Sequence, residues 1–82
     1  MTNKEKIFST ICTVLAEYIP EGTAVSENTR IVADLEIDSV DVFDLIMEVE
    51  DAYDISISME LISNTHTVGE LVNVVDNLIS AN

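Results

Sequence analysis

Residues 34–51 read DLEIDSVDVFDLIMEVED, with eight carboxylates and no basic side chain. After Ser39, the one hydroxyl of this stretch, apolar residues recur at intervals of three and four, which predicts an amphipathic helix. We expect this helix to begin at Ser39 and to run to about Tyr53. Its inward face carries Val42, Leu45, Ile46, Val49 and Tyr53.

The opposite face of this helix is predicted to be acidic. Its carboxylates, spaced three, four and three residues apart, are those of Asp41, Asp44, Glu48 and Asp51. Val40 and Met47 border them. Like charges at such spacings destabilise a helix by roughly a few tenths of a kcal/mol per pair, so a face without interleaved lysines indicates an interaction surface. Asp38 is the expected N-cap, accepting a hydrogen bond from the amide of Val40 or Asp41.

A first helix and a long connection are expected before this stretch. Residues 7–19 have apolar side chains at helical spacing, with Thr2 or Asn3 as the cap and Pro20 at the end. Residues 20–38 form a connection longer than most links between helices, and long ordered loops are usually functional. The apolar side chains expected to hold it against the core are Ile31, Val32 and Leu35.

The remainder of the chain is also predicted to be helical. A short helical turn is expected near residues 59–63, and a last helix opens with a capping box formed by Thr67 and Glu70. The predicted fold is therefore a single all-α domain over residues 1–82. It is a small bundle of three main helices plus one short helix, with a long loop between the first and second helices.

The charge of the chain limits its partners. Its net charge is −13, with only three basic residues, and residues 31–82 hold twelve acids and no lysine or arginine. Such a chain cannot neutralise a row of phosphates, which argues against nucleic acid, and an anionic membrane surface repels it. Positively charged proteins are its natural partners, and we expect a monomer. The single cysteine, Cys12, and the lack of a signal-like N-terminus favour a cytoplasmic protein.

Three kinds of chemistry can be tested at Ser39. A calcium loop beginning at Asp34 fails, because its sixth residue is Ser39 instead of glycine and its twelfth is Leu45 instead of glutamate. No other metal site is expected. A serine nucleophile fails as well, because the only histidine, His66, lies just before the last helix and no Gly-x-Ser-x-Gly elbow surrounds the hydroxyl. A plain first-turn serine, or a serine modified by another enzyme, remains.

Asp38-Ser39-Val40 at a helix start resembles the Asp-Ser-Leu motif of the acyl carrier proteins. The resemblance covers most of the chain. Residues 28–35 are similar to the family's loop before the motif, and residues 41–53 to its acidic recognition helix. Residues 54–57 and 65–68 resemble the links around its short third helix. Together with the chain length and the acidic, base-poor composition, these segments make the resemblance to this family strong.

The resemblance implies a carrier and not an enzyme. A holo-acyl-carrier synthase (a phosphopantetheinyl transferase) would attach 4′-phosphopantetheine to Ser39, next to Asp38, and the arm would hold acyl groups as thioesters. Acyltransferases and ketosynthases with basic patches, from fatty-acid, lipid or polyketide biosynthesis, would be its further partners. The partner-binding residues that the resemblance implies are Val40, Asp41, Asp44, Met47, Glu48, Asp51 and Ile57.

Two alternatives and several departures accompany this interpretation. An aminoacyl or peptidyl carrier, including a D-alanyl carrier, shares the fold and the serine. An acidic helical adaptor explains the charge but not the placement of Asp38 and Ser39. Glu36 stands where the family usually has glycine, Val40 replaces leucine, and Ser58 and Met59 occupy positions where proline and an acid are common. These departures favour a specialised pathway over housekeeping fatty-acid synthesis.

Overall fold

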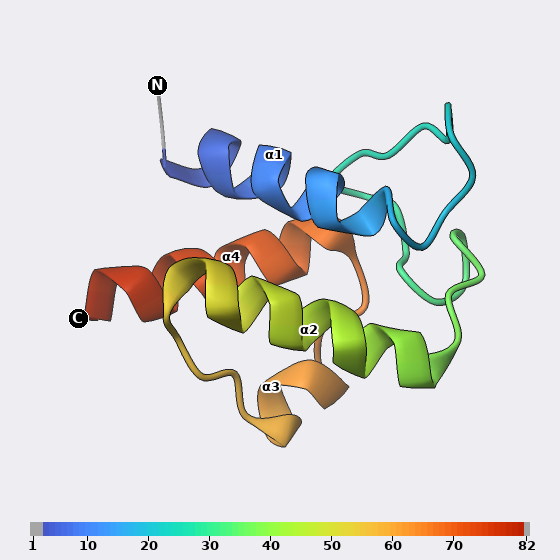
Figure 1. The fold of residues 1–82 in the computed structure, drawn as a ribbon. Coiled ribbons are helices and arrows are strands. Elements are labelled where there is room, and N and C mark those ends of the chain that lie inside the picture. Colours follow the sequence, from blue (N-terminus) through green and yellow to red (C-terminus); the bar gives the residue numbers. More distant parts are fainter. Residues whose placement is uncertain (1–2, 82) are drawn as a thin grey trace.

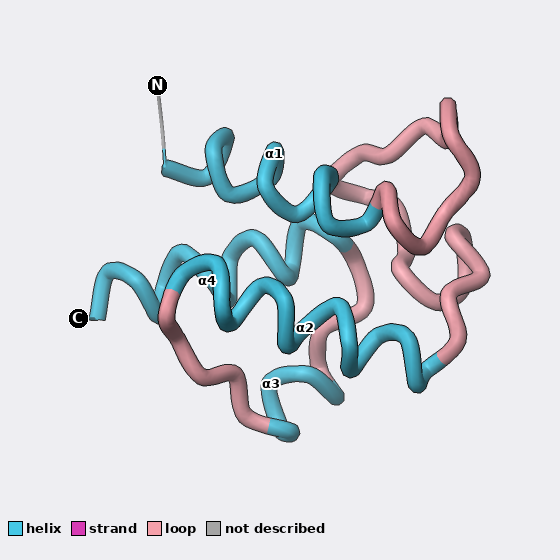
Figure 2. Tube along the Cα trace, viewed as in Figure 1, coloured by secondary structure: helices cyan, strands magenta, loops and turns pink. Residues whose placement is uncertain are grey.

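Four helices follow one another along the chain in the computed structural model, which describes residues 3–81 (Figure 1). They are α1 (Asn3–Leu15), α2 (Ser39–Tyr53), α3 (Met59–Ser63) and α4 (Val68–Ala81). The described chain is drawn as helices and loops without a strand (Figure 2). Among the described residues, the extended backbone forms only an isolated antiparallel bridge between Arg30 and Thr67. The all-α fold with three main helices, one short helix and a long first connection is confirmed.

Helix α2 begins at the predicted residue, but the predicted side-chain cap is not formed. Asp38 has the extended backbone of an N-cap (φ −62°, ψ 147°), and its carbonyl accepts the first helical bond from Val42 N–H at 3.0 Å. Its side chain, however, makes no capping hydrogen bond, so that expectation was wrong. The Asp38 carboxylate is exposed, where water competes for the same bond, and Asp41 adds like charge to the first turn.

The first helix ends earlier than expected. It stops at Leu15, and the chain continues as a tight turn in which Tyr18 N–H donates to the Leu15 carbonyl at 2.8 Å. The prediction that Pro20 ends this helix was therefore wrong, because bonds between residues three apart replace the helical ones before the proline is reached. Asn3 already lies within α1, and Thr2, the alternative cap, lies outside the described residues.

The capping box at the start of α4 is confirmed. Glu70 N–H donates to Thr67 Oγ1 at 3.1 Å, and Glu70 Oε1 accepts from the backbone N–H groups of Thr67 (2.9 Å) and His66 (2.8 Å). The bonds from these two amides lower the pKa of the Glu70 carboxyl. This local network fixes the point at which α4 begins.

The long connection is held against α4 by main-chain hydrogen bonds. Val68 N–H donates to the Thr29 carbonyl at 3.0 Å and Gly69 N–H to the Glu27 carbonyl at 2.8 Å. On the other side, Ile31 N–H donates to the His66 carbonyl at 2.9 Å. A side chain at Gly69 would not fit, because a Cβ there would lie 2.9 Å from the Glu27 carbonyl oxygen.

The core is aliphatic and receives side chains from every major segment. Ile31 of the long connection is buried as expected, but Val32 is 56% exposed and Leu35 is only half-buried, so the expectation for Val32 was wrong. Residues 31–35 turn back on the Arg30 carbonyl, which points successive side chains in different directions. Ile37 fills the core instead. The buried set is Ile7, Ile11, Leu15, Ile31, Ile37, Leu45, Ile46, Val49, Ile57, Val68, Leu71, Val72 and Val75.

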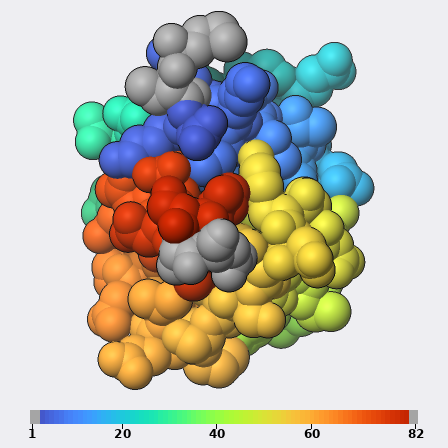
Figure 3. All heavy atoms as spheres, turned by 90° about the vertical axis from the view of Figure 1, so that its left-hand side faces the viewer, coloured from blue at the N-terminus to red at the C-terminus, as the bar shows by residue number. Residues whose placement is uncertain are grey.

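The helices pack around this core as neighbours. α1 contacts both α4 and α2. Viewed from the end of the bundle at which α4 ends, the surface of α1 adjoins that of α4 (Figure 3). Across residues 3–81, none of the helices combines the length and the apolar character needed to cross a membrane.

Candidate functional site

Ser39 is the first residue of α2 and is exposed. Its hydroxyl takes part in no hydrogen bond with the other described residues. The first helical bond of α2 is made by Val42 N–H, so the amides of Ser39, Val40 and Asp41 have no intrahelical acceptor. Because the Asp38 side chain does not cap the helix, these amides stay available to an acceptor outside the helix. The N-terminus of a helix favours such an acceptor when it is an anion.

The one arginine before Ser39 is already engaged. Arg30 donates from its guanidinium to Asp34 at 3.2 Å and from its backbone N–H to the same carboxylate at 2.8 Å. The backbone bond, followed by the side-chain bond, lowers the pKa of Asp34. The sequence pattern did not predict this pair, because both residues lie in the long connection, where no helical spacing applies. The carboxylates nearest in sequence to Ser39, those of Glu36, Asp38 and Asp41, have no such basic partner among the described residues.

The outer side of α2 exposes apolar side chains beside its carboxylates. Val40 is 65% exposed, Met47 60% and Phe43 41%. Among the four predicted acids, Asp44 and Asp51 are exposed, whereas Asp41 and Glu48 are half-buried. The exposed outer side therefore combines an apolar centre with carboxylates along one edge. We call the exposed set the α2 face, defined by Val40, Phe43, Asp44, Met47 and Asp51.

Glu48 is half-buried and bonds to the turn after α1. Its Oε2 accepts a hydrogen bond of 2.6 Å from the Tyr18 hydroxyl. This bond, then burial, then the charges of Glu48, Asp44 and Glu17 raise the pKa of Tyr18 to about 12. The expectation that Glu48 lies with the other acids on one outward stripe needs correction, because Tyr18 holds its carboxylate toward the turn after α1. Only the three-dimensional structure identifies this partner.

Ile57 lies in the core and not on the surface. Its side chain is 7% exposed, as predicted for an inward residue, and its backbone N–H donates to Glu50 Oε2 at 2.6 Å. Burial leaves little of this side chain for a partner, and the partner contact there stays a prediction. Nearby in the chain, Met59 and Leu61 of α3 are exposed apolar side chains.

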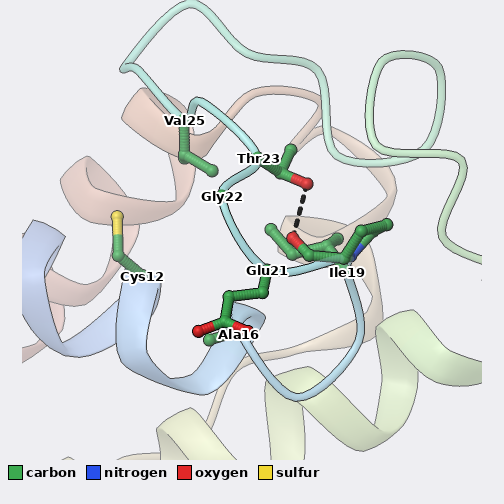
Figure 4. A pocket seen from close by; sticks show the side chains of 8 residues that line it. Cys12, Ala16, Ile19, Glu21, Gly22, Thr23 and Val25 are labelled. Atoms are coloured by element: carbon green, nitrogen blue, oxygen red, sulfur yellow. Dashed lines mark hydrogen bonds between the residues drawn. The ribbon is translucent and has the colours of Figure 1, made fainter.

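A second feature of the described residues is a hollow beside Cys12. Beside Cys12 lies an open hollow of about 640 Å³, bordered by the loop from Ile19 to Val25, in which Thr23 Oγ1 donates to the Pro20 carbonyl at 2.6 Å (Figure 4). Burial raises the pKa of the Cys12 thiol, which makes it a weaker nucleophile at neutral pH. In the described part of the chain, no group of three or more histidine, cysteine, aspartate or glutamate side chains could hold a metal ion.

Comparisons with known proteins agree with these features. The family described as "Phosphopantetheine attachment site" matches residues 5–75. The acyl carrier protein of Picosynechococcus sp. is 30% identical over 79 residues, which cover 95% of this chain and 98% of that protein. The acyl carrier protein of Streptococcus pyogenes serotype M1 is 36% identical over 70 residues, covering 85% of this chain and 92% of that protein.

A solved structure supports the same assignment. It comes from Mycobacterium tuberculosis and is itself provisionally assigned as an acyl carrier protein. It is 34% identical and superposes with a TM-score of 0.73, covering 93% of this chain and 97% of that one. The exposed serine at the start of α2, the helical order and these matches lead to one conclusion. The chain belongs to the acyl carrier proteins, the family defined by a phosphopantetheine attachment site.

Proposed function

We propose that this protein carries acyl groups as thioesters on a 4′-phosphopantetheine arm attached to Ser39. The observation that carries the proposal is the position of the Ser39 hydroxyl. It is exposed at the first residue of α2, beside amides without intrahelical acceptors, in a chain of the phosphopantetheine-attachment family. The arm supplies a terminal thiol that forms thioesters, and Ser39 Oγ anchors it.

The residues around Ser39 fit a phosphodiester. The backbone N–H groups of Val40 and Asp41 are available to phosphate oxygens, and the positive end of the helix dipole favours the negative charge. Because the hydroxyl is exposed, the remaining phosphate oxygens could stay hydrated.

Among the described residues, no basic side chain is hydrogen-bonded to the Ser39 hydroxyl to activate it. The only histidine of the chain, His66, is exposed before α4, and its backbone carbonyl binds Ile31. A separate transferase must therefore remove the proton of the Ser39 hydroxyl as Oγ attacks the phosphorus next to the pantetheine of coenzyme A. A new P–O bond forms, the P–O bond of the pyrophosphate breaks, and adenosine 3′,5′-bisphosphate leaves. The protein is thus a substrate of the transferase and not a catalyst.

The α2 face suits partners that bind briefly. Exposed carboxylates of Asp44 and Asp51 attract a basic surface over a distance, while Val40, Phe43 and Met47 offer apolar area for contact. Such a surface fits the phosphopantetheinyl transferase and the acyltransferases and ketosynthases of lipid or polyketide synthesis. A monomer, with the α2 face unobstructed, can meet these enzymes in turn.

The attachment is tested with two serine variants. After incubation with coenzyme A and a broad-specificity transferase, mass spectrometry should show one added phosphopantetheinyl group on the wild type and none on Ser39→Ala. Ser58→Ala is the matched control, because Ser58 also stands at a helix start but its hydroxyl accepts Leu61 N–H at 3.2 Å. We expect the control to be loaded. Loading of Ser39→Ala, or no loading of the wild type, would contradict the proposal.

A further inference from the structure

Glu36 adopts a backbone conformation that L-residues rarely occupy. Its φ is +54°, in the left-handed region, three residues before Ser39. A residue with a Cβ is less stable there than glycine. Asp54 is the only other described residue besides glycine with a positive φ, and it has a structural role as the C-cap of α2, where its N–H donates to the Glu50 carbonyl.

The fold explains why the backbone at residue 36 is left-handed, but it does not explain why a glutamate occupies this position. The preceding turn is closed on the Arg30 carbonyl, which accepts from the amides of Asp34 and Leu35. Directly after Glu36, the side chain of Ile37 enters the core and is 3% exposed. A left-handed residue between these two anchors reverses the chain direction, and glycine would do so with less strain.

The Glu36 side chain makes no contact that offsets this strain. It is exposed, and it takes part in no hydrogen bond or ion pair with the described residues. The anchors on both sides fix the backbone from which it projects, three residues before Ser39, and its carboxylate is exposed. Strained residues of this kind occur preferentially where they serve a function.

We propose that Glu36 is a specificity-determining residue for the transferase that modifies Ser39, a role that rests on the function proposed above. The transferase must bring its reacting atoms to the Ser39 hydroxyl itself, so the rim of its active site covers the residues that flank this hydroxyl. Enzymes that act later meet the end of the flexible arm and need not approach so closely. Glu36 therefore selects a transferase whose rim is basic at this point and disfavours one whose rim is acidic.

The test measures by mass spectrometry how fast a transferase that modifies the wild type adds the phosphopantetheinyl group from coenzyme A. The wild type is compared with three variants. Glu36→Gln keeps the side-chain length and the left-handed backbone but removes the charge, whereas Glu36→Gly removes both the charge and the strain. Glu27→Gln is the matched control. Glu27 is likewise exposed in the long connection, but it lies beside Lys4 and Phe8 of α1, and its backbone carbonyl binds Gly69.

We expect both Glu36 variants to load about 3- to 10-fold more slowly than the wild type at low ionic strength. The difference should shrink at high salt, and Glu27→Gln should load like the wild type. Thermal unfolding tests whether the backbone at residue 36 is strained. Glu36→Gly should have a higher melting temperature than Glu36→Gln. Equal loading of Glu36→Gln, Glu27→Gln and the wild type would overturn the inference, as would slow loading of Glu36→Gly alone. A wild type that no transferase loads would instead contradict the proposed function.

Discussion

The Tyr18 hydroxyl donates a hydrogen bond of 2.6 Å to Glu48 Oε2 and so joins the turn after α1 to the edge of α2. The bond favours the protonated phenol, which raises the pKa of Tyr18 to about 12 in the folded protein. In the unfolded chain this pKa is about 10. A raised folded-state pKa contributes stability that is fully present below about pH 10 and is lost as the pH rises toward about 12.

Replacing Glu48 should therefore lower the pKa of Tyr18. In a Tyr53→Phe background, where Tyr18 is the only tyrosine, the tyrosinate absorbance reports this group alone. Glu48→Gln should move its pKa toward about 10 and weaken the loss of stability between about pH 10 and 12. Asp51→Asn is the control, because it removes the same charge from α2 without a bond to Tyr18. Equal pKa values in both variants would show that the hydrogen bond is not the main cause.

Gly69 should be intolerant of a side chain despite its place in a helix. In Gly69→Ala the new Cβ would meet the Glu27 carbonyl oxygen at 2.9 Å and the Glu27 Cβ at 3.1 Å. The loop would have to move and would strain the bond that holds it to α4, so we expect a loss of about 1–3 kcal/mol in unfolding free energy. Asn73→Ala, at an exposed position of α4, should change it by less than about 0.5 kcal/mol. Urea unfolding measures both, and a stabilised Gly69→Ala would refute the close contact.

The α2 face should show separate electrostatic and apolar effects on loading. Asp44→Lys should slow association with a basic transferase, and the loss should shrink at high salt, because exposed charges steer partners. Met47→Ala should weaken the complex independently of salt, by about 1 kcal/mol if half its side chain is buried on docking. Asp76→Lys on α4 changes the net charge equally and serves as the control. If it slows loading as much as Asp44→Lys does, net charge governs recognition.

Acyl cargo should be visible at the aliphatic core. Its buried residues on α2 and α4 include Leu45, Val49, Val68 and Leu71, with no aromatic or polar side chain among the buried set. If an acyl chain enters between the helices, NMR of acylated protein should show shift changes at these methyl groups. Protein with the arm but no acyl group is the control. Changes confined to Ser39 and its neighbours would mean that the chain stays in water, as expected for an aminoacyl carrier.

Local patterns made much of the fold predictable from the sequence. The bounds of α2 and α3 follow from apolar spacing and nearby caps, and the Thr67–Glu70 capping box involves residues only three apart. Ser39 could be singled out because its neighbours in sequence are also its neighbours at the helix start. These features depend on interactions within one helical turn.

Interactions between distant segments were not predictable in this way. The Tyr18–Glu48 bond spans thirty residues, and the bond from Ile57 N–H to Glu50 forms across the end of α2. The long connection turns within residues 31–35, so its exposed and buried side chains, Val32 and Ile37 among them, follow no helical or strand period. The position of Glu48 and the exposure of Val32 follow from such contacts and not from a local period.

The most direct test of an acyl-bearing arm on Ser39 uses an acyl-coenzyme A as the donor. After incubation with the transferase, fragmentation mass spectrometry should place the combined mass of arm and acyl group on a fragment containing Ser39. Neutral hydroxylamine should then remove the acyl group and leave the arm, because it cleaves thioesters. Added mass on a fragment without Ser39, or an acyl group that resists hydroxylamine, would contradict the account.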